Sequence, residues 1–235
     1  MRRSQSAVQV LSLVSALAGA SGAALAADAQ HPIVIELFQS QGCNSCPPAN
    51  ANINALSDRS DILTLSFAIT YWDNLGWKDT FAKQQYTDRQ YAYSHALGAD
   101  GVYTPQVIVN GRKAGVGTSL SEIESLEASG ARPPGPSMSL NAGGVAIGAG
   151  AAPASGADVW LVRYDPRQLD VAIARGENAG KTLPHRNIVK ELTRLGHWSG
   201  QAERLDIPAG GDQALRVAVL VQNAGEGAIL AAVKQ

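Results

Sequence analysis

The sequence lacks the features by which many functional classes are identified. Its 235 residues have a formal net charge of −1 and no cluster of lysine and arginine, so nucleic acids and anionic membranes are poor partner candidates. Methionine occurs only twice, and the four histidines (His31, His95, His185 and His197) show no metal-ligand spacing. Zinc usually needs four ligands, so no metal site is predicted. No organic cofactor is implied either.

Cysteine is almost absent, and its only two copies, Cys43 and Cys46, lie close together. A disulfide between them closes a loop of about four residues, which adds only roughly 2 kcal/mol in the chain-entropy model. A chain of this length also builds a hydrophobic core without covalent links. Reactivity therefore explains the pair better than stabilisation does. An inert disulfide and a soft-metal site for copper(I) are the alternatives.

The first 26 residues have the pattern of a secretory signal peptide. Arg2 and Arg3 precede a short apolar run over residues 8–20, and Ala24-Leu25-Ala26 is a small-x-small cleavage sequence. We expect cleavage after Ala26 and a periplasmic or secreted location, where disulfides persist. An uncleaved anchor is the alternative, which the short and partly polar run disfavours. No later segment is apolar enough to span a membrane.

Residues 27–130 predict a mixed α/β domain. Residues 33–38 and 63–69 read as strands, and a helix between them carries Pro47 in its first turn. A long helix is expected to run from an N-cap at Asp79 to Gly98. The remaining patterns are a hairpin around Asn110-Gly111 and a helix to about residue 128 that opens with the capping box of Ser119 and Glu122.

The rest of the chain has a different character. Residues 131–136 are rich in proline and predict a stiff linker. Beyond it, residues 137–235 predict a small all-β sandwich-like domain with glycine-rich turns. Its strands are expected at residues 137–140, 145–147, 159–164, 169–174, 203–207, 214–222 and 228–233. The predicted architecture is therefore an α/β domain followed by a separate β domain.

The cysteines fall at a junction between a strand and a helix, which suits redox chemistry. Unpaired N–H groups and the positive end of the helix dipole favour a thiolate at Cys43. Cys46 lies one turn further on and can resolve a mixed disulfide. We expect Cys43 to be the exposed nucleophile and Cys46 the shielded one. Thr104-Pro105 opens the third strand, and we expect its peptide bond to be cis and to lie against the cysteines.

This combination resembles the thioredoxin superfamily, in which a cis proline faces the active-site cysteines. It is more closely similar to a bacterial family of secreted thioredoxin-like proteins known mainly as a domain of unknown function. The phrases that carry this similarity are Glu36-Leu37-Phe38, Gly42-Cys43-Asn44-Ser45-Cys46-Pro47-Pro48-Ala49, Tyr71-Trp72-Asp73, Gly76-Trp77-Lys78-Asp79, Tyr103-Thr104-Pro105-Gln106 and Arg175-Gly176-Glu177-Asn178-Ala179-Gly180. The resemblance implies a thioredoxin-like fold and redox chemistry but no substrate.

The chain also departs from thioredoxin itself. No tryptophan precedes Cys43, no Gly-Pro separates the cysteines, and the insert before Pro105 is longer. A general reductase role of the cytosolic type is therefore not expected.

Several other residues have two interpretations. Glu36 is either a partly buried proton relay to the cysteines or a solvent-facing strand residue. Trp72, Trp77 and Tyr103 either contact substrate or pack on the core. The polar phrases at residues 175–178 and 185–187 either reach the redox site or bind a ligand, or they form structured turns, and we favour the structured turns.

The leading hypothesis is a periplasmic thiol–disulfide oxidoreductase. Cys43 and Cys46 exchange disulfides with protein or peptide substrates, Thr104 and Pro105 align the substrate, and a membrane electron carrier is the expected redox partner. The alternative is a binding module that keeps the fold and carries copper(I) or a peptide. The direction of electron flow and the oligomeric state do not follow from the sequence.

Overall fold

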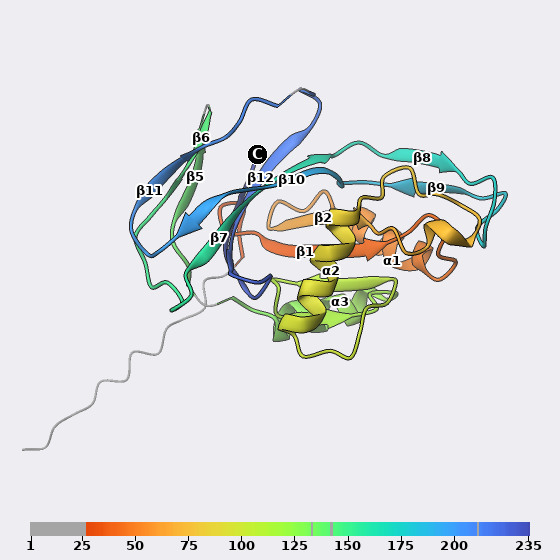
Figure 1. The fold of residues 1–235 in the computed structure, drawn as a ribbon, viewed down its shortest axis with the longest axis horizontal. Coiled ribbons are helices and arrows are strands. Elements are labelled where there is room, and N and C mark those ends of the chain that lie inside the picture. Colours follow the sequence, from red (N-terminus) through yellow and green to blue (C-terminus); the bar gives the residue numbers. More distant parts are fainter. Residues whose placement is uncertain (1–26, 133, 142, 211) are drawn as a thin grey trace, which may run out of the picture.

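The computed structural model describes residues 27–132, 134–141, 143–210 and 212–235 (Figure 1). The predicted signal peptide, residues 1–26, lies outside the described residues. Within them, no helix combines the length and the apolar character needed to cross a bilayer.

A single large sheet of eight strands runs through the molecule in the order β13-β12-β7-β10-β2-β1-β3-β4 (Figure 1). Parallel pairing joins β1 to β2, whereas β3 is antiparallel to β1 and β4 to β3. The strands are β1 (Ile33–Gln39), β2 (Ile62–Ala68), β3 (Gln106–Val109), β4 (Lys113–Gly115), β7 (Ala157–Asp165), β10 (Ile188–Trp198), β12 (Arg216–Asn223) and β13 (Ile229–Lys234).

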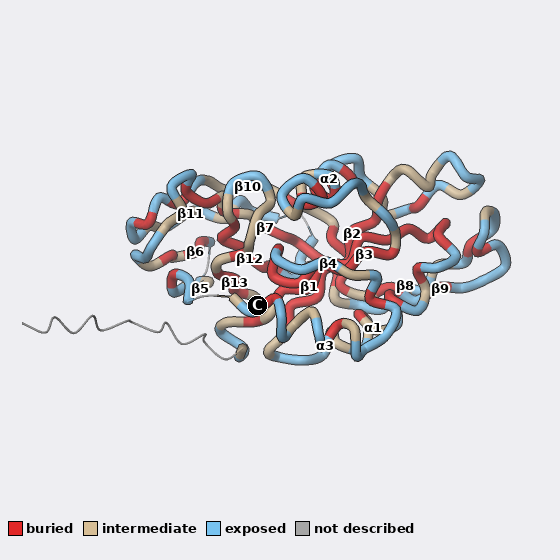
Figure 2. Tube along the Cα trace, turned by 90° about the horizontal axis from the view of Figure 1, so that it is seen from below, coloured by how far each residue is buried: buried red, intermediate tan, exposed pale blue. Residues whose placement is uncertain are grey.

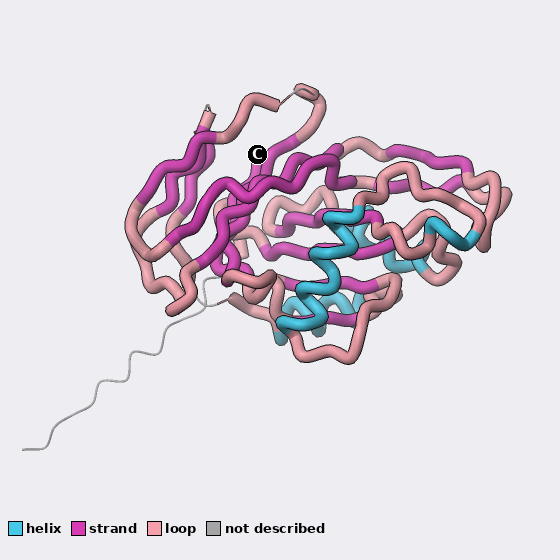
Figure 3. Tube along the Cα trace, viewed as in Figure 1, coloured by secondary structure: helices cyan, strands magenta, loops and turns pink. Residues whose placement is uncertain are grey.

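The helices are few and lie around the end of the sheet formed by β1 to β4, as Figure 3 shows. They are α1 (Cys46–Leu56), α2 (Gln84–Ala96), α3 (Leu120–Ser129) and the short 3-10 helix η1 (Asp73–Leu75). The other end carries a three-stranded sheet of β5 (Met138–Asn141), β6 (Gly144–Ile147) and β11 (Glu203–Asp206). A hairpin of β8 (Leu169–Ala172) and β9 (Thr182–His185) extends beside α1.

The order of elements in residues 33–129 is the predicted β-α-β, helix, β-β-α. The hairpin turn at Asn110 and Gly111 is confirmed, with positive φ angles of 50° and 63°. Ser119 caps α3 by accepting the N–H of Glu122. The second helix begins later than predicted. It starts at Gln84, because the buried Asp79 carboxylate binds the backbone N–H groups of the preceding loops instead of capping α2.

The separate β-sandwich predicted for residues 137–235 is not confirmed. Strand β10 pairs in parallel with β2 at Ile188 and Ser66, and the Ser66 N–H donates to the Asn187 carbonyl at 2.9 Å. Four strands after the proline-rich segment, β7, β10, β12 and β13, therefore continue the sheet of the first half. The reason is that the outer edge of β2 has unpaired backbone groups, which a further strand satisfies.

The hydrophobic core also joins the two halves. Beneath α2, Phe38 and Tyr86 from the first half pack in one cluster with Val162 and Leu220 from the second. Figure 2 shows the buried trace running through the middle of the sheet, with exposed residues on the outer helices and hairpins. A second cluster lies under α1 and α3, and a third fills the space between the large sheet and the three-stranded sheet. The cluster beneath α2 therefore needs residues from both halves of the chain.

Candidate functional site

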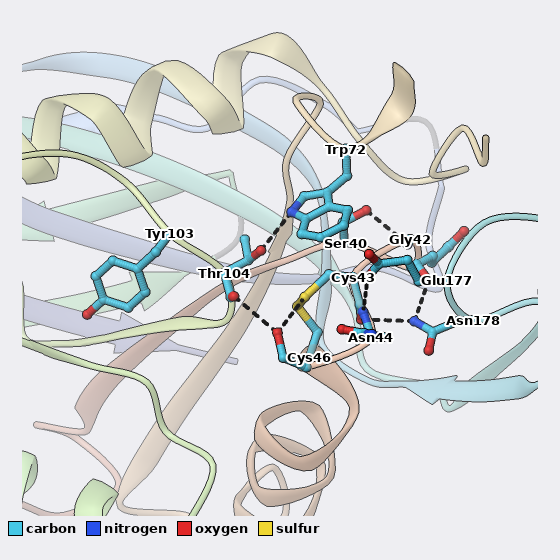
Figure 4. Close-up of a disulfide and its surroundings, with 12 residues drawn as sticks. Ser40, Gly42, Cys43, Asn44, Cys46, Trp72, Tyr103, Thr104, Glu177 and Asn178 are labelled. Carbon is cyan, nitrogen blue, oxygen red and sulfur yellow. Dashed lines mark hydrogen bonds between the residues drawn. A yellow bond between two sulfur atoms is a disulfide. The ribbon is translucent and has the colours of Figure 1, made fainter. Parts of the chain in front are cut away.

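The two cysteines form a disulfide at the start of α1 (Figure 4). Their Cα atoms are 5.4 Å apart. Pro47 and Pro48 occupy the first turn of the helix, where a backbone N–H has no partner within the helix. The chain thus leaves β1, turns and presents the disulfide at the positive end of a helix dipole. Among the described residues, no group of three or more histidine, cysteine or acidic side chains could hold a metal ion.

Both sulfur atoms are buried, which corrects the prediction that Cys43 is exposed. Cys43 is 0% and Cys46 2% exposed, while Asn44 and Ser45 between them face solvent. The physical reason is that two loops from other parts of the chain pack over the turn. In this oxidised state neither sulfur is open to an attacking thiol.

One side of the disulfide is formed by Thr104 (Figure 4). The Ser45 hydroxyl lies 3.3 Å from Cys43 Sγ and donates to the Thr104 carbonyl at 3.4 Å. Trp72 Nε1 donates to Thr104 Oγ1 at 2.8 Å. The Thr104-Pro105 bond is cis, as predicted. Tyr103 is 40% exposed, and its ring points away from the disulfide.

Gln41, two residues before Cys43, connects the loops around the site. It is 0% exposed. Its backbone N–H donates to Asp79 Oδ2 at 2.7 Å, and its side-chain oxygen accepts from Trp77 Nε1 at 2.9 Å. Its carbonyl accepts from Asn178 Nδ2 at 2.9 Å. Sequence reasoning missed Gln41, because a polar residue after a buried strand carries no local signal of such contacts.

Asp79 is a buried ionisable group that Gln41 connects to the cysteine turn. It is 2% exposed, and this burial raises the pKa of its carboxyl to about 6. The N–H groups of Gln41 and Phe81 favour the charged form and oppose the shift, while the nearby Asp73 adds to it. The site therefore contains a buried acid that changes charge below neutral pH.

On the opposite side of the disulfide, residues 174–179, which we call the cover segment, bind the backbone of the cysteine turn. Asn178 is 0% exposed and donates through Nδ2 to the carbonyls of Gln41 and Cys43, each at 2.9 Å. The Glu177 carboxylate accepts the Asn44 N–H at 3.3 Å. Figure 4 shows both residues on the side of the disulfide away from Thr104. The phrase at residues 175–178 therefore reaches the redox site, contrary to the interpretation favoured from sequence.

The second polar phrase, residues 185–187, lies along α1 instead of at the sulfurs. Asn50, Asn54 and Asp58 follow one another at helical spacing on one face. Asn50 and Asn54 both donate to the Pro184 carbonyl, at 2.6 and 3.0 Å. Arg186 forms a bidentate ion pair with Asp58, at 2.7 and 2.8 Å. This strip attaches the helix that carries the cysteines to β9.

His185 is part of the same contact. It is 1% exposed, its Nδ1 lies 3.2 Å from Asn50 Nδ2, and its ring packs edge-on against Phe81. Burial lowers the pKa of this histidine to about 4. It is therefore neutral at physiological pH and serves the packing of α1.

Glu36 is not a solvent-facing strand residue. It is 0% exposed, and both carboxylate oxygens are occupied. Arg89 Nε donates to Oε1 at 2.9 Å, and the Tyr93 hydroxyl donates to Oε2. Arg89 and Tyr93 also bind the side chain of Gln222 on β12, at 2.9 and 2.8 Å. A buried acid needs such partners, and they bind Glu36 into the core between the two halves.

The matches to known proteins extend over both halves of the chain. The model of the family described as "Protein of unknown function (DUF1223)" matches residues 34–222. A crystal structure of a protein from Agrobacterium tumefaciens has 33% sequence identity and a TM-score of 0.73, and the match covers 90% of this chain and 95% of that one. HBP35 of Porphyromonas gingivalis has 14% identity and a TM-score of 0.57, covering 88% of this chain and 75% of that one, which shows a similar fold alone. No curated protein matches.

Proposed function

We infer that this chain, which belongs to the DUF1223 family, is a thiol–disulfide oxidoreductase acting through Cys43 and Cys46. The observation that carries the proposal is the disulfide itself. It lies at the N-terminus of α1, with the Thr104 carbonyl on one side, within hydrogen-bond reach of Ser45. Such an environment favours a reactive thiolate once the pair is reduced.

The arrangement of the first half supports a thioredoxin-like core. Strands β2, β1, β3 and β4 are neighbours in that order, and α1 follows β1 directly. Cys46 begins α1 and Cys43 lies in the turn before it. Thr104 and Pro105 precede β3, and the Thr104 carbonyl accepts from Ser45 between the cysteines. The residues of the second half then extend the sheet and complete the surroundings of the disulfide.

In the proposed reaction the Cys43–Cys46 dithiol of the reduced protein is oxidised to the disulfide, while a substrate disulfide is reduced. The Cys43 thiolate attacks one substrate sulfur, the substrate S–S bond breaks, and the departing sulfur takes the electron pair and a proton. The Cys46 thiolate then attacks Cys43, the Cys43–Cys46 bond forms, and the second substrate thiol leaves. The reverse sequence oxidises a substrate dithiol. Backbone groups at Thr104 are placed to align an extended peptide substrate.

Glu36 is not among the proposed reacting groups, because its oxygens are held by Arg89 and Tyr93. Trp72 and Trp77 are half-buried and use their indole N–H groups on Thr104 and Gln41. We propose that they shape the site and that Tyr103, which is more exposed, contacts substrate at its margin. The periplasmic location rests on residues 1–26, and the membrane redox partner rests on the need to regenerate the pair; both stay predictions.

A trapping experiment tests the proposal. Cys46→Ser leaves Cys43 without a resolving partner, so the reduced variant should accumulate mixed disulfides with a substrate disulfide. Cys43→Ser is the matched control and should trap far less. The reduced wild-type protein should turn over a disulfide substrate when a dithiol is supplied. Absence of both trapping and turnover, together with stoichiometric copper(I) binding by the reduced pair, would favour the binding module instead.

A further inference from the structure

The cover segment, residues 174–179, is a closed connection between the strands of the β8–β9 hairpin. At its base Gly180 N–H donates to the Ile173 carbonyl at 2.8 Å, and Ile173 N–H donates to the Lys181 carbonyl at 2.9 Å. Its tip bends back through a turn in which the Ala179 N–H donates to the Gly176 carbonyl at 3.1 Å. The hairpin thus carries a compact loop that reaches the cysteine turn from more than a hundred residues away in the chain.

The contact between the cover segment and the neighbouring loop is close. Gly176 has a φ of +79°, and a Cβ atom there would lie 3.3 Å from Trp77 Cβ and 3.5 Å from the Leu75 carbonyl oxygen. Glycine therefore permits both the backbone conformation and the approach of the two loops. Beside this contact Asn178 binds the Gln41 and Cys43 carbonyls, and Cys43 is 0% exposed.

The cover segment is held mainly by polar contacts at its tip. Ala174, Arg175, Glu177 and Ala179 are exposed, and Asn178 is the one residue of the segment that is buried. Loops with few buried apolar contacts open locally at a smaller free-energy cost than core strands do. The cover can therefore leave the disulfide without unfolding of the sheet.

We propose that the cover segment determines which thiols react with the disulfide, through Asn178 and Glu177 as positioning residues. This proposal rests on the proposed function. A small opening admits a small thiol, whereas a polypeptide thiol needs Asn178 and Glu177 to leave the cysteine turn entirely. The rate of thiol–disulfide exchange depends on access to the attacked sulfur, so the segment selects substrates by size.

In the open state the exchange is a simple transfer of electrons. A substrate thiolate attacks Cys43 Sγ, the new bond forms as the Cys43–Cys46 bond breaks, and the electron pair goes to the Cys46 sulfur, which takes a proton. The second thiolate of the substrate then attacks the substrate sulfur that is bonded to Cys43 in the mixed disulfide. The Cys43 thiolate is released, and the substrate leaves oxidised to a disulfide.

Glu177 also acts on the released thiolate. Its carboxylate accepts the Asn44 N–H, a donor at the start of the helix that otherwise favours negative charge at Cys43. Closure of the cover should therefore raise the pKa of the Cys43 thiol. Glu177→Gln keeps an acceptor and removes the charge, so the pKa of Cys43 should fall in this variant. A residue with a purely structural role would not change this property.

The test compares two probes, dithiothreitol and reduced, unfolded ribonuclease A, as reductants of the oxidised protein. In one variant an Asn-Gly turn replaces residues 174–179 and joins Ile173 to Gly180. We expect its rate with ribonuclease to rise about tenfold or more and its rate with dithiothreitol to rise much less. Asn178→Ala should act in the same direction with a smaller effect, and it carries the test if the shortened hairpin fails to fold.

Asp170→Asn is the matched control, because it removes an exposed acid on the same hairpin away from the cysteine turn. It should alter neither the ratio of the two rates nor the pKa of Cys43. The proposal is overturned if the ratio is the same in the wild-type protein, the shortened variant and Asn178→Ala. If the wild-type disulfide exchanges with neither probe, the proposed function itself fails, which is a distinguishable result.

Discussion

Two buried polar clusters, one within β1 and one just beyond its end, differ in how they are built. The first, which we call the ion-pair cluster, comprises Glu36, Arg89, Tyr93 and Gln222. The second, the Gln41 cluster, comprises Gln41, Trp77, Asp79 and Asn178. Both bring residues of the second half onto the first. In the ion-pair cluster the partners stand on strands and a helix, whereas in the Gln41 cluster they stand on loops.

The difference follows from their positions relative to the sheet. Glu36 lies within β1, where its neighbours on both sides are paired strands, and it is compensated by a guanidinium that is 1% exposed. Gln41 lies beyond the end of β1, where backbone groups have no ladder partners and loops must supply them. A polar cluster inside the sheet stabilises the fold, and one at its end leaves room for the loops to move near a reactive group.

The largest expected effect is on the ion-pair cluster. Arg89→Met leaves the Glu36 carboxylate buried without its partner, which should lower the free energy of unfolding by about 3–5 kcal/mol. Arg194→Met is the control, because this arginine is 51% exposed in its pair with Asp158 and should cost less than about 1 kcal/mol. Urea unfolding measures both. A similar small loss in the two variants would show that the ion-pair cluster is no more important to the fold than an exposed ion pair.

The next effect concerns pH and His185, which lies between α1 and β9. Its folded-state pKa of about 4 is below its ordinary value of 6.5, so the unfolded chain binds more protons between these values. Stability should therefore fall as the pH falls from 6.5 to 4, by on the order of 3 kcal/mol. His185→Gln should abolish this part of the acid sensitivity. Unfolding curves over this pH range in which the variant and the wild type run parallel would contradict the prediction.

Asp79 of the Gln41 cluster should act with the opposite sign. Its folded-state pKa of about 6 is above the ordinary 3.8, so the folded state binds more protons between these values. Its contribution to stability is present below pH 3.8 and is lost as the pH rises through 6, by about 2–3 kcal/mol. In the wild type it partly offsets His185. Asp79→Asn should therefore lose stability more steeply on acidification than the wild type does.

The smallest effect is expected at Trp77. Trp77→Phe removes the indole N–H that binds Gln41 Oε1, which should cost about 0.5–1.5 kcal/mol of stability. Because the same Gln41 also binds Asn178 of the cover segment through its carbonyl, the variant should increase the reaction rate with a protein thiol. Trp72→Phe loses a comparable bond to Thr104 on the other side of the disulfide. Its rate should stay near that of the wild type, and equal acceleration in both variants would show that the cover is not the barrier.

Local patterns in the sequence were sufficient for much of the first half. A nearly continuous apolar run indicates β1, alternating apolar residues indicate β2, and a proline in a first turn indicates the start of α1. The Asn-Gly pair indicates the hairpin, and Ser119 with Glu122 indicates the start of α3. The two cysteines and the Thr104-Pro105 pair were identified for the same reason. Each of these signals lies within a few neighbouring residues, and local backbone preferences determine the result.

Long-range contacts decided the rest. Strand β10 was missed because two register shifts interrupt its period of two, at Val189/Glu191 and Arg194/Gly196. Its pairing with β2 turned two expected domains into one sheet. Asn178 meets Cys43 across 135 positions of sequence and Gln222 meets Arg89 across 133. Only the folded chain brings these groups together, because burial and hydrogen-bond satisfaction are properties of the whole packed structure and leave no trace in the neighbouring residues.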